Sequence, residues 1–280
     1  MTLIMGVVNA TPDSFSDGGR FLSADAAVAH ARELRAAGAD ILDVGGESTR
    51  PGAERVSPAE EQARVLPVVA ALAADGAVVS IDTMNASTAR AAVELGARIV
   101  NDVSGGLNDP DMLAVVAASG VDVVLQHWRG HSADMYAHAA YDDLARELVV
   151  ELEDRLEAAA LAGISPDRVI LDPGIGFGKR GPQNWEALRA LERIVAIGPR
   201  VLVGTSRKGF LADALAAADG RAAEVSTARR DLATAVTSVL AAQAGVWAVR
   251  VHDAAATRDA LAVWEHWSGH HSIDDRGGNA

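Results

Sequence analysis

Polar side chains that could form one binding or catalytic site directly follow a series of short apolar runs in the sequence. Carboxylates and amides bind the N–H groups of polar ligands, whereas Arg, Lys and His bind oxyanions such as phosphate. The residues concerned are Asn9, Asp43 with Glu47, Asp82, Asn101 with Asp102, His127, Asp172, Ser206 with Arg207 and Lys208, and Arg250 with His252. The turns before the same runs consist mostly of Gly and Ala. The side chains that could bind a ligand or catalyse a reaction are therefore concentrated at one end of the apolar elements.

The elements that would position these residues alternate along the chain. Short runs of Val, Ile and Leu without strict polar alternation predict parallel strands that are buried on both faces. Ala-rich amphipathic stretches between them predict helices. The expected strands span residues 3–8, 41–44, 78–81, 99–100, 121–125, 169–171, 201–203 and 246–251. The expected helices span residues 24–37, 58–74, 86–95, 109–118, 144–162, 184–195, 208–215 extended by 228–244, and 254–267.

Eight strand–helix units predict an α/β fold, a single-domain (β/α)8 TIM barrel over residues 1–267. An open, doubly wound parallel sheet is the alternative, because a sequence does not show whether a sheet closes. A barrel carries its active site at the carboxyl ends of its strands, which is where the polar residues lie. Residues 10–21 and 45–57 form long connections at that end, which are typical of binding loops or lids. Residues 268–280 are polar, and we expect a disordered tail there.

The polar residues fall into two chemical groups. Asp82, Asn101 and Asp172 provide oxygens for a planar heterocycle with adjacent N–H donors. A buried carboxylate needs such donors, because an isolated charge is costly to bury. The donors suited to an oxyanion are Arg50, Lys208, Arg250 and His252. Together the two groups favour a ligand in which a polar heterocycle is joined to a phosphate.

Composition excludes several classes of function. Lys and Arg number 25 against 38 Asp and Glu, the net charge is −13 and no basic run is present, so we expect no nucleic-acid partner. No apolar stretch approaches about 18 residues, and no basic segment opens an N-terminal signal peptide. We therefore expect no membrane partner and a cytoplasmic location. Cysteine is absent, which excludes disulfides, thiolate nucleophiles and Cys-type zinc sites.

Other local patterns match known motifs poorly. Residues 174–179 read GIGFGK, but their glycine spacing and Arg180 differ from the phosphate-binding GxxxxGK[ST] motif. His131 and His138 lie in an irregular segment after His127, so we do not expect a zinc site there. Lysine occurs only at Lys179 and Lys208, whereas arginine supplies the other 23 basic residues. A position that keeps lysine in this chain is therefore of interest.

Seven segments resemble, in the same order, the signature motifs of dihydropteroate synthases. Two of them are longer than ten residues: residues 5–19 read MGVVNATPDSFSDGG and residues 43–53 read DVGGESTRPGA. The others are SIDT at 80–83, NDVSGG at 101–106, LDPGIGFGK at 171–179, SRK at 206–208 and RVHD at 250–253. The resemblance covers essentially the whole expected barrel.

The resemblance implies a (β/α)8 barrel, in agreement with the strand–helix count, and a homodimer that we expect to form through the last helices. It implies the condensation of 6-hydroxymethyl-7,8-dihydropterin diphosphate with p-aminobenzoate, which gives 7,8-dihydropteroate and pyrophosphate in folate biosynthesis. Mg²⁺ is the implied cofactor, and sulfonamides are mimics of the second substrate. We expect an SN1-like displacement, because the pterin nitrogens support a cationic methylene while Mg²⁺, Arg and His stabilise the departing diphosphate.

The matched motifs also imply roles for individual residues. The implied pterin-binding residues are Asp82, Asn101, Asp172 and Lys208. The implied diphosphate-binding residues are Asn9, which also holds Mg²⁺, and Arg50, Arg250 and His252. The implied p-aminobenzoate-binding residues are Thr49, Pro51, Phe177 and Ser206. The expected catalytic set is Asp17 in the first long loop, Arg50, Lys208, Arg250 and His252.

Two other functions are compatible with the same barrel. A catalytically inactive pterin-binding relative would be expected to have a degraded second loop, whereas residues 47–52 retain the motif ESTRPG. A pterin-dependent methyltransferase would not need the motifs at 11–19, 206–208 and 250–252 together. Residues 126–130 read QHWRG where many family members have MHMQG, and we assign them no role. We expect Lys208→Ala to abolish pterin binding and Lys179→Ala to cost much less.

Overall fold

The structure is a computed structural model that describes residues 1–10, 20–47, 56–131, 136–137, 139–219 and 225–269. Four residues of the expected site lie outside this part of the chain: Asp17, Thr49, Arg50 and Pro51. His138 and residues 270–280 of the expected tail lie outside it as well.

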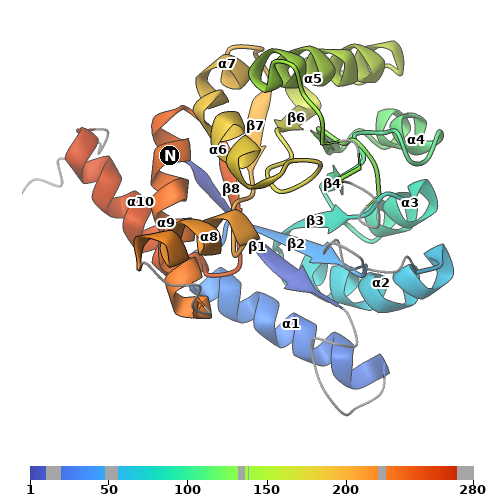
Figure 1. Cartoon of the computed structure of the whole chain (residues 1–280). Helices are drawn as coiled ribbons and strands as arrows, with labels where there is room; N and C mark the ends of the chain where they lie inside the picture. Colours follow the sequence, from blue (N-terminus) through green and yellow to red (C-terminus); the bar gives the residue numbers. More distant parts are fainter. Residues whose placement is uncertain (11–19, 48–55, 132–135, 138, 220–224, 270–280) are drawn as a thin grey trace, which may run out of the picture.

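Eight parallel strands close into a barrel in which each strand pairs with the next and the last pairs with the first. The strands are β1 (Leu3–Asn9), β2 (Ile41–Gly45), β3 (Val78–Asp82), β4 (Ile99–Asp102), β5 (Asp122–Gln126), β6 (Val169–Asp172), β7 (Arg200–Val203) and β8 (Ala248–Val251). Figure 1 shows the helices arranged around these strands. Closure confirms the TIM barrel and excludes the open sheet.

Helices follow the strands, with two departures from the expected pattern. Those described are α1 (Arg20–Ala36), α2 (Pro58–Ala74), α3 (Ala86–Glu94), α4 (Met112–Ser119), α5 (Leu144–Leu161), α6 (Gly181–Arg189), α7 (Leu191–Val195), α8 (Gly209–Ala218), α9 (Thr227–Gln243) and α10 (Ala254–Ser268). The single helix expected over 184–195 is wrong, because Ala190, with φ −86° and ψ 0°, separates α6 from α7. The expected start of the fourth helix at 109 is also wrong: Asp109 instead accepts the backbone N–H groups of Ala86 and Asp111.

Two layers of apolar side chains hold the barrel together. The larger layer lies between the strands and the surrounding helices and contains most of the buried Val, Leu, Ile and Ala. The smaller layer comes from the strands alone and consists of Met5, Ile41, Ile99, Val124, Ile170, Leu202 and Ala248. Burial on both faces explains why the strands read as continuous apolar runs.

Helix ends follow local sequence signals. The hydroxyl of Ser57 accepts the backbone N–H of Glu60 at the start of α2, and Pro58 occupies the first turn. Gly120 ends α4 in the left-handed conformation with φ 75°, which glycine adopts without steric cost. Within the described ranges, no helix has the length and apolar content needed to cross a membrane.

Candidate active site

Side-chain alternation along the strands positions the polar residues of the barrel mouth, which is the opening of the barrel at the carboxyl ends of its strands. Residues two positions apart on a strand face the same side of the sheet. Four members of the inner apolar cluster are Ile41, Ile99, Ile170 and Ala248. The residues two positions further on are Asp43, Asn101, Asp172 and Arg250. A mostly apolar layer, in which Ser80 of β3 pairs in register with Ile99, is therefore followed, one step nearer the carboxyl ends, by a layer of charged and amide side chains.

Arg250 lies between two carboxylates in this layer. Its Nε donates to Oδ2 of Asp43 at 2.6 Å, and its Nη2 donates to Oδ2 of Asp82 at 2.7 Å. The side-chain amide of Asn101 donates to the same Asp43 oxygen at 3.0 Å. These four residues come from β8, β2, β3 and β4. Their contacts therefore depend on closure of the barrel.

Burial changes the acidity of this cluster. It raises the pKa of Asp82 to about 7, opposed by the charge of Arg250 and reinforced by that of Asp43. Burial disfavours the charge of Arg250, but the attraction of Asp43 and Asp82 outweighs it and raises the pKa of the guanidinium above its ordinary value. Oδ1 of Asp43 is buried and has no hydrogen-bond partner among the described residues. Because an unpaired buried oxygen is costly, the mouth favours a ligand that brings N–H donors.

Asp172 and Lys208 lie beside this cluster and influence each other electrostatically. Oδ1 of Asp172 accepts the backbone N–H of Gly174 at 2.7 Å. Burial raises the pKa of Asp172, and Lys208 is the main group that opposes this shift. Removal from water lowers the pKa of Lys208 to about 8, opposed by Asp172. The Lys208 ammonium donates to the carbonyl of Ile175 and lies 4.9 Å from the centre of the Phe177 ring.

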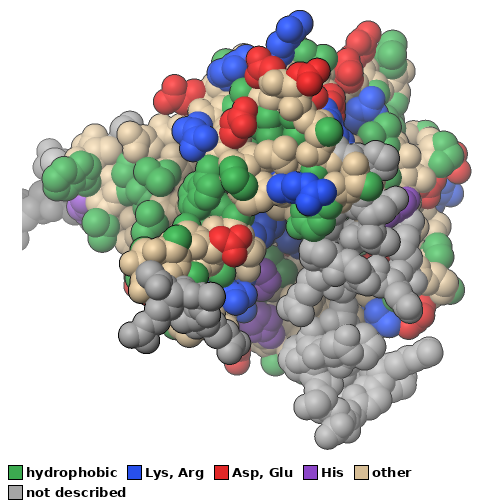
Figure 2. Space-filling view, viewed as in Figure 1, with side chains coloured by type: hydrophobic (Ala, Val, Ile, Leu, Met, Phe, Trp, Pro, Cys, Tyr) green, Lys and Arg blue, Asp and Glu red, His purple; other side chains and the backbone are tan. Residues whose placement is uncertain are grey.

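Gly204 leaves space between the two charged groups. It lies two positions beyond Leu202 of the inner cluster, so it occupies the level of Asp172 and Arg250. A Cβ at Gly204 would lie 3.6 Å from Cβ of Arg250 and 3.8 Å from Nζ of Lys208. The absent side chain leaves the mouth open at this point. In Figure 2 basic and His side chains lie close together near the centre of the same face.

A strained turn directs Lys208 toward the mouth. Arg207 has φ 58°, the one positive φ of a non-glycine residue among those described, and this conformation costs about 1–2 kcal/mol. Its Nε and Nη2 donate to the two carboxylate oxygens of Asp231 on α9 at 2.7 and 2.9 Å. This bidentate pair helps to offset the strain. Arg207 thus anchors the turn, while its neighbours Ser206 and Lys208 contact other groups of the site.

Ser206 and His252, in the connections that follow β7 and β8, orient each other. The backbone N–H of His252 donates to the hydroxyl oxygen of Ser206 at 3.1 Å, and the same hydroxyl lies 2.8 Å from Nδ1 of the imidazole. If the hydroxyl donates to Nδ1, the remaining proton of the neutral ring is on Nε2. In that tautomer the ring provides an N–H donor of fixed orientation, which suits an oxyanion.

The structure brings most of the described expected site residues together. Asp82, Asn101, Asp172, Lys208, Arg250, Ser206 and His252 lie around one mouth, with Phe177 beside Lys208. Asn9 ends β1 with an exposed side chain and is four positions beyond Met5, on the same face. Asp43 was expected at this end of the barrel, but the sequence assigned it no ligand role. The structure places it between Arg250 and Asn101.

Not every polar residue at a strand end belongs to the site. Asp102 accepts the backbone N–H and hydroxyl of Ser104 at 2.8 and 2.6 Å, and the N–H of Gly106 at 2.8 Å. Burial raises the pKa of Asp102 to about 6, although its bonds to Ser104 oppose the shift. Its role is to shape the connection that follows β4.

Gly174 offers a test of how tightly the connection after β6 is packed. It has φ 64°, and a Cβ there would lie 2.3 Å from the backbone oxygen of His127. Gly120 has a similar φ of 75°, but nothing lies within 4 Å of its Cβ position. We expect Gly120→Ala to lower the free energy of unfolding by about 1–2 kcal/mol, the cost of the backbone conformation alone.

Gly174→Ala should cost clearly more than Gly120→Ala and should also reduce ligand binding, because the backbone that must shift carries the N–H bonded to Asp172. Chemical denaturation of the two variants measures the difference. Equal losses of stability would contradict the steric argument.

The fold and the mouth define a class of protein. A parallel (β/α)8 barrel with carboxylates, an amide and cations on its carboxyl-end face has the architecture of a barrel enzyme. The unpaired carboxylate oxygen and the neighbouring cations indicate a ligand with N–H donors and a negative charge. The nature of that ligand is narrowed by comparison with known proteins.

A family model described as pterin binding enzyme matches residues 5–252. A dihydropteroate synthase from Mycobacterium leprae is 51% identical over 265 residues, which cover 94% of this chain and 93% of the relative. The structure of a Xanthomonas albilineans dihydropteroate synthase with 4-aminobenzoic acid has a TM-score of 0.86 and 44% identity, with 95% and 93% of the two chains covered. A structure of the Xanthomonas albilineans enzyme with 7,8-dihydropteroate has a TM-score of 0.83 and 41% identity, with 95% and 94% covered.

The chain therefore belongs to the dihydropteroate synthase family of pterin-binding enzymes, which are transferases. The match from residue 5 to residue 252 includes all eight strands, apart from the first two residues of β1.

Proposed function

We propose that this chain condenses 6-hydroxymethyl-7,8-dihydropterin diphosphate with p-aminobenzoate to give 7,8-dihydropteroate and pyrophosphate. The observation that carries the proposal is the cluster at the mouth, in which Arg250 joins Asp43 and Asp82 beside Asp172 and Lys208. The similar Xanthomonas albilineans structures with 4-aminobenzoic acid and 7,8-dihydropteroate support the second substrate and the product.

The pterin ring fits the carboxylate side of the mouth. Its amino and N–H groups are adjacent donors, and Asp82 and Asp172 are buried acceptors that such donors satisfy. The Asn101 amide has both a donor and an acceptor, so it can bind a mixed edge of the ring. The ammonium of Lys208 can donate to a ring acceptor. The pterin therefore supplies donors to the carboxylates of Asp82 and Asp172 on this side of the mouth.

The diphosphate fits the cationic side. Arg250 has five N–H donors, and its bonds to Asp43 and Asp82 use two of them. His252 is oriented by Ser206 and can donate from Nε2. We propose that both bind the diphosphate, together with Arg50.

Asn9 fits the proposed Mg²⁺ site. Mg²⁺ commonly takes one or two protein oxygens and completes its shell with phosphate oxygens and water. The exposed amide of Asn9 can supply one such oxygen at the end of β1. When bound with the diphosphate, Mg²⁺ supplies positive charge that stabilises the leaving group.

We propose an SN1-like mechanism. The bond between the pterin methylene and the diphosphate oxygen breaks, and its electron pair leaves with the diphosphate. The amine lone pair of p-aminobenzoate then forms the C–N bond, and the nitrogen releases a proton. Asp82, Asp172 and Lys208 hold the ring, while Arg250 and His252 stabilise the charge that develops on the leaving group. A neutral arylamine needs no strong base before it attacks, so no nucleophile–base pair is required.

The test is incubation with the pterin diphosphate, labelled p-aminobenzoate and Mg²⁺. Labelled dihydropteroate and pyrophosphate should form, chelation should stop turnover, and added Mg²⁺ should restore it. Folded protein that binds pterin but forms no product would favour the inactive relative. Turnover that persists in a chelator would contradict the metal proposal alone.

Positional isotope exchange tests the order of bond changes. The ¹⁸O label is placed in the oxygen that joins the pterin methylene to the diphosphate. Exchange of this label into non-bridging positions of the phosphate in the absence of p-aminobenzoate indicates that the C–O bond breaks first. Absence of exchange would favour concerted displacement.

We propose that the chain forms a homodimer through α9 and α10, which lie side by side (Figure 1). Leu232, Val236 and Leu240 are exposed at four-residue intervals on α9, and Val263 and Trp267 are exposed on α10, Trp267 by 90%. Figure 2 shows hydrophobic side chains on this side of the molecule. A two-fold axis would bury this apolar face against the same face of a second copy.

Leu240→Glu should convert the dimer to a monomer, because it introduces a charge into the apolar face. Leu161→Glu is the matched control, since Leu161 is also an exposed leucine, more exposed than Leu240, but lies on α5. Sedimentation at micromolar concentration measures the mass of each variant. A monomeric parent chain, or dissociation by both substitutions, would exclude this interface. The cytoplasmic location expected from the sequence stays a prediction.

A further inference from the structure

A second lysine is buried directly behind the mouth. Lys179 is 1% exposed and is one of the largest fully buried side chains among the described residues. Its ammonium has three partners: the carbonyls of Gly174 at 3.1 Å and Phe177 at 3.2 Å, and Nδ1 of His127 at 3.0 Å. An ammonium has three N–H donors, so each has an acceptor. Burial lowers the pKa of Lys179 to about 7, whereas the three acceptors around the nitrogen favour its charged form.

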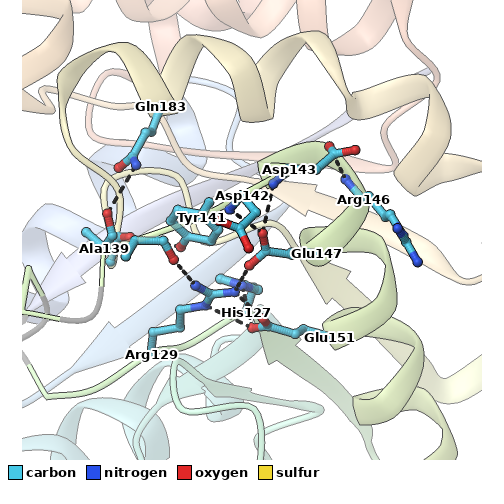
Figure 3. Close-up of polar contacts among 12 residues, drawn as sticks. His127, Arg129, Ala139, Tyr141, Asp142, Asp143, Arg146, Glu147, Glu151 and Gln183 are labelled. Carbon is cyan, nitrogen blue, oxygen red and sulfur yellow. Dashed lines mark hydrogen bonds and ion pairs between the residues drawn. The ribbon is translucent and has the colours of Figure 1, made fainter.

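His127 connects this lysine to the outer helix α5. Burial, reinforced by the charge of Lys179, lowers the pKa of His127 to about 4, so the imidazole is neutral at pH 7. A neutral ring that accepts at Nδ1 carries its proton on Nε2. Nε2 lies 2.9 Å from Oε2 of Glu151. Figure 3 shows His127 facing Glu151, with Arg129 alongside.

Arg129 links the glutamates of α5 to Tyr141, which in turn contacts the connection after β6. Its Nη2 contacts both Glu151 and Glu147, and its guanidinium lies 3.9 Å from the centre of the Tyr141 ring (Figure 3). The Tyr141 hydroxyl donates to the carbonyl of Gly178 at 2.8 Å. The connection after β6 is thus held at residues 174 and 177 by Lys179, and at residue 178 by Tyr141 from the chain between β5 and α5.

The held segment is the one that touches Lys208. The N–H of Phe177 donates to the carbonyl of Gly174 at 3.0 Å and closes a turn over residues 174–177. Lys179 binds the two carbonyls at the ends of this turn. Between them, the Ile175 carbonyl accepts from Lys208, and the Phe177 ring lies 4.9 Å from its ammonium. Lys179 does not contact Lys208 directly, but it binds the turn that orients Lys208.

We propose that Lys179 is a positioning residue: with His127 and Glu151 behind it, its ammonium holds the turn over residues 174–177 in the shape that places Phe177 and the Ile175 carbonyl against Lys208. Only the expected fall in kcat rests on the proposed function. The expected change in the surroundings of Lys208 can be measured in the protein without ligand. The role is larger than the sequence alone suggested for Lys179.

The scarcity of lysine allows a direct test. The chain has two lysines, so incorporation of ¹³C-labelled lysine gives two ε-CH₂ signals in an NMR spectrum, which Lys179→Met and Lys208→Met assign. The ε-CH₂ protons of Lys208 should carry a ring-current shift from Phe177. Phe177→Leu should remove this shift and supplies the reference value. Lys179→Met should move the Lys208 signal toward the Phe177→Leu value.

Glu151→Met and Glu147→Met form a matched pair that leaves Lys179 in place. Both remove a partner of Arg129, but Glu151 also contacts His127. Glu151→Met should move the Lys208 signal, whereas Glu147→Met should not. These substitutions lie on α5 and keep the proposal testable if Lys179→Met does not fold.

The kinetic consequence is a fall in kcat of about 10-fold or more for Lys179→Met, because small displacements at a site reduce rates strongly. The affinity for pterin should fall less than in Lys208→Met. A Lys208 signal unchanged in both Lys179→Met and Glu151→Met would overturn the proposal. A parent chain without synthase activity would contradict the proposed function instead, since the NMR result does not depend on turnover.

Discussion

Arg250→Met should reduce turnover by roughly 100-fold or more, which is the usual effect of losing one donor that stabilises transition-state charge. It should also destabilise the fold, because the substitution leaves Asp43 and Asp82 buried without their cation. Removing one partner of a buried ion pair costs about 3–5 kcal/mol. Thermal unfolding and steady-state kinetics measure the two effects separately.

The loss of stability in Arg250→Met should increase with pH. The pKa of Asp82 is raised to about 7 by burial, and Arg250 is the group that opposes this rise. A carboxyl whose pKa is higher in the folded state contributes stability below its unfolded pKa of about 4, and that stability is lost as pH rises through the folded value. Without Arg250 the folded pKa rises further, so the decline continues above pH 7.

The difference in Tm between the parent chain and Arg250→Met should therefore be small near pH 5 and large near pH 8. Arg258→Met is the control, because Arg258 is half-exposed and pairs with its neighbour Asp259. It should change Tm little at any pH. A difference for Arg250→Met that does not vary with pH would show that Asp82 does not depend on this guanidinium.

Lys208→Met should weaken pterin binding by about 100-fold, since a hydrogen bond to a charged group contributes about 1.5–3 kcal/mol. Methionine retains most of the apolar length beside Phe177 and removes the ammonium. The lowered pKa of Lys208, about 8, adds a pH signature. The cation is lost as pH rises through 8, so the parent affinity should decline there.

Calorimetric titration with the pterin between pH 6.5 and 9 measures this signature. Any decline that Lys208→Met shares comes from the ligand, and only the excess in the parent chain belongs to the lysine. Equal, mild effects of Lys208→Met and Lys179→Met on affinity would contradict the proposal that the pterin binds beside Lys208.

The strands could be predicted because their burial on both faces leaves an apolar run in the sequence. Each expected run contains the core of an observed strand, but several strands continue into the polar residues that follow. β3 ends at Asp82 and β6 at Asp172, rather than one residue earlier. The polar groups are therefore part of the sheet, a fact that apolar patterning does not reveal because it marks only the buried portion.

The residues that form the mouth could be predicted, but the hydrogen bonds and ion pairs among them could not. Asp82, Asn101, Asp172 and Lys208 were expected to share one end of the barrel. That Arg250 reaches both Asp43 and Asp82 depends on strand register and barrel closure. Burial of Lys179 was equally hidden, because lysine is rarely buried and its three acceptors come from residues 5, 2 and 52 positions away.

The placement of Lys208 at the mouth and of Lys179 buried behind it has a consequence for chemical modification. Arginine, which does not react with amine-selective acylating reagents, supplies every other basic side chain apart from histidine. Lys179 is almost completely buried, and Lys208 is half-buried with a lowered pKa that enriches the reactive neutral amine. Side-chain acylation of the folded chain is thereby concentrated on a group inside the binding site. The exterior of the barrel, although rich in charge, offers such reagents no lysine, so the yield of side-chain acylation measures how accessible the mouth is.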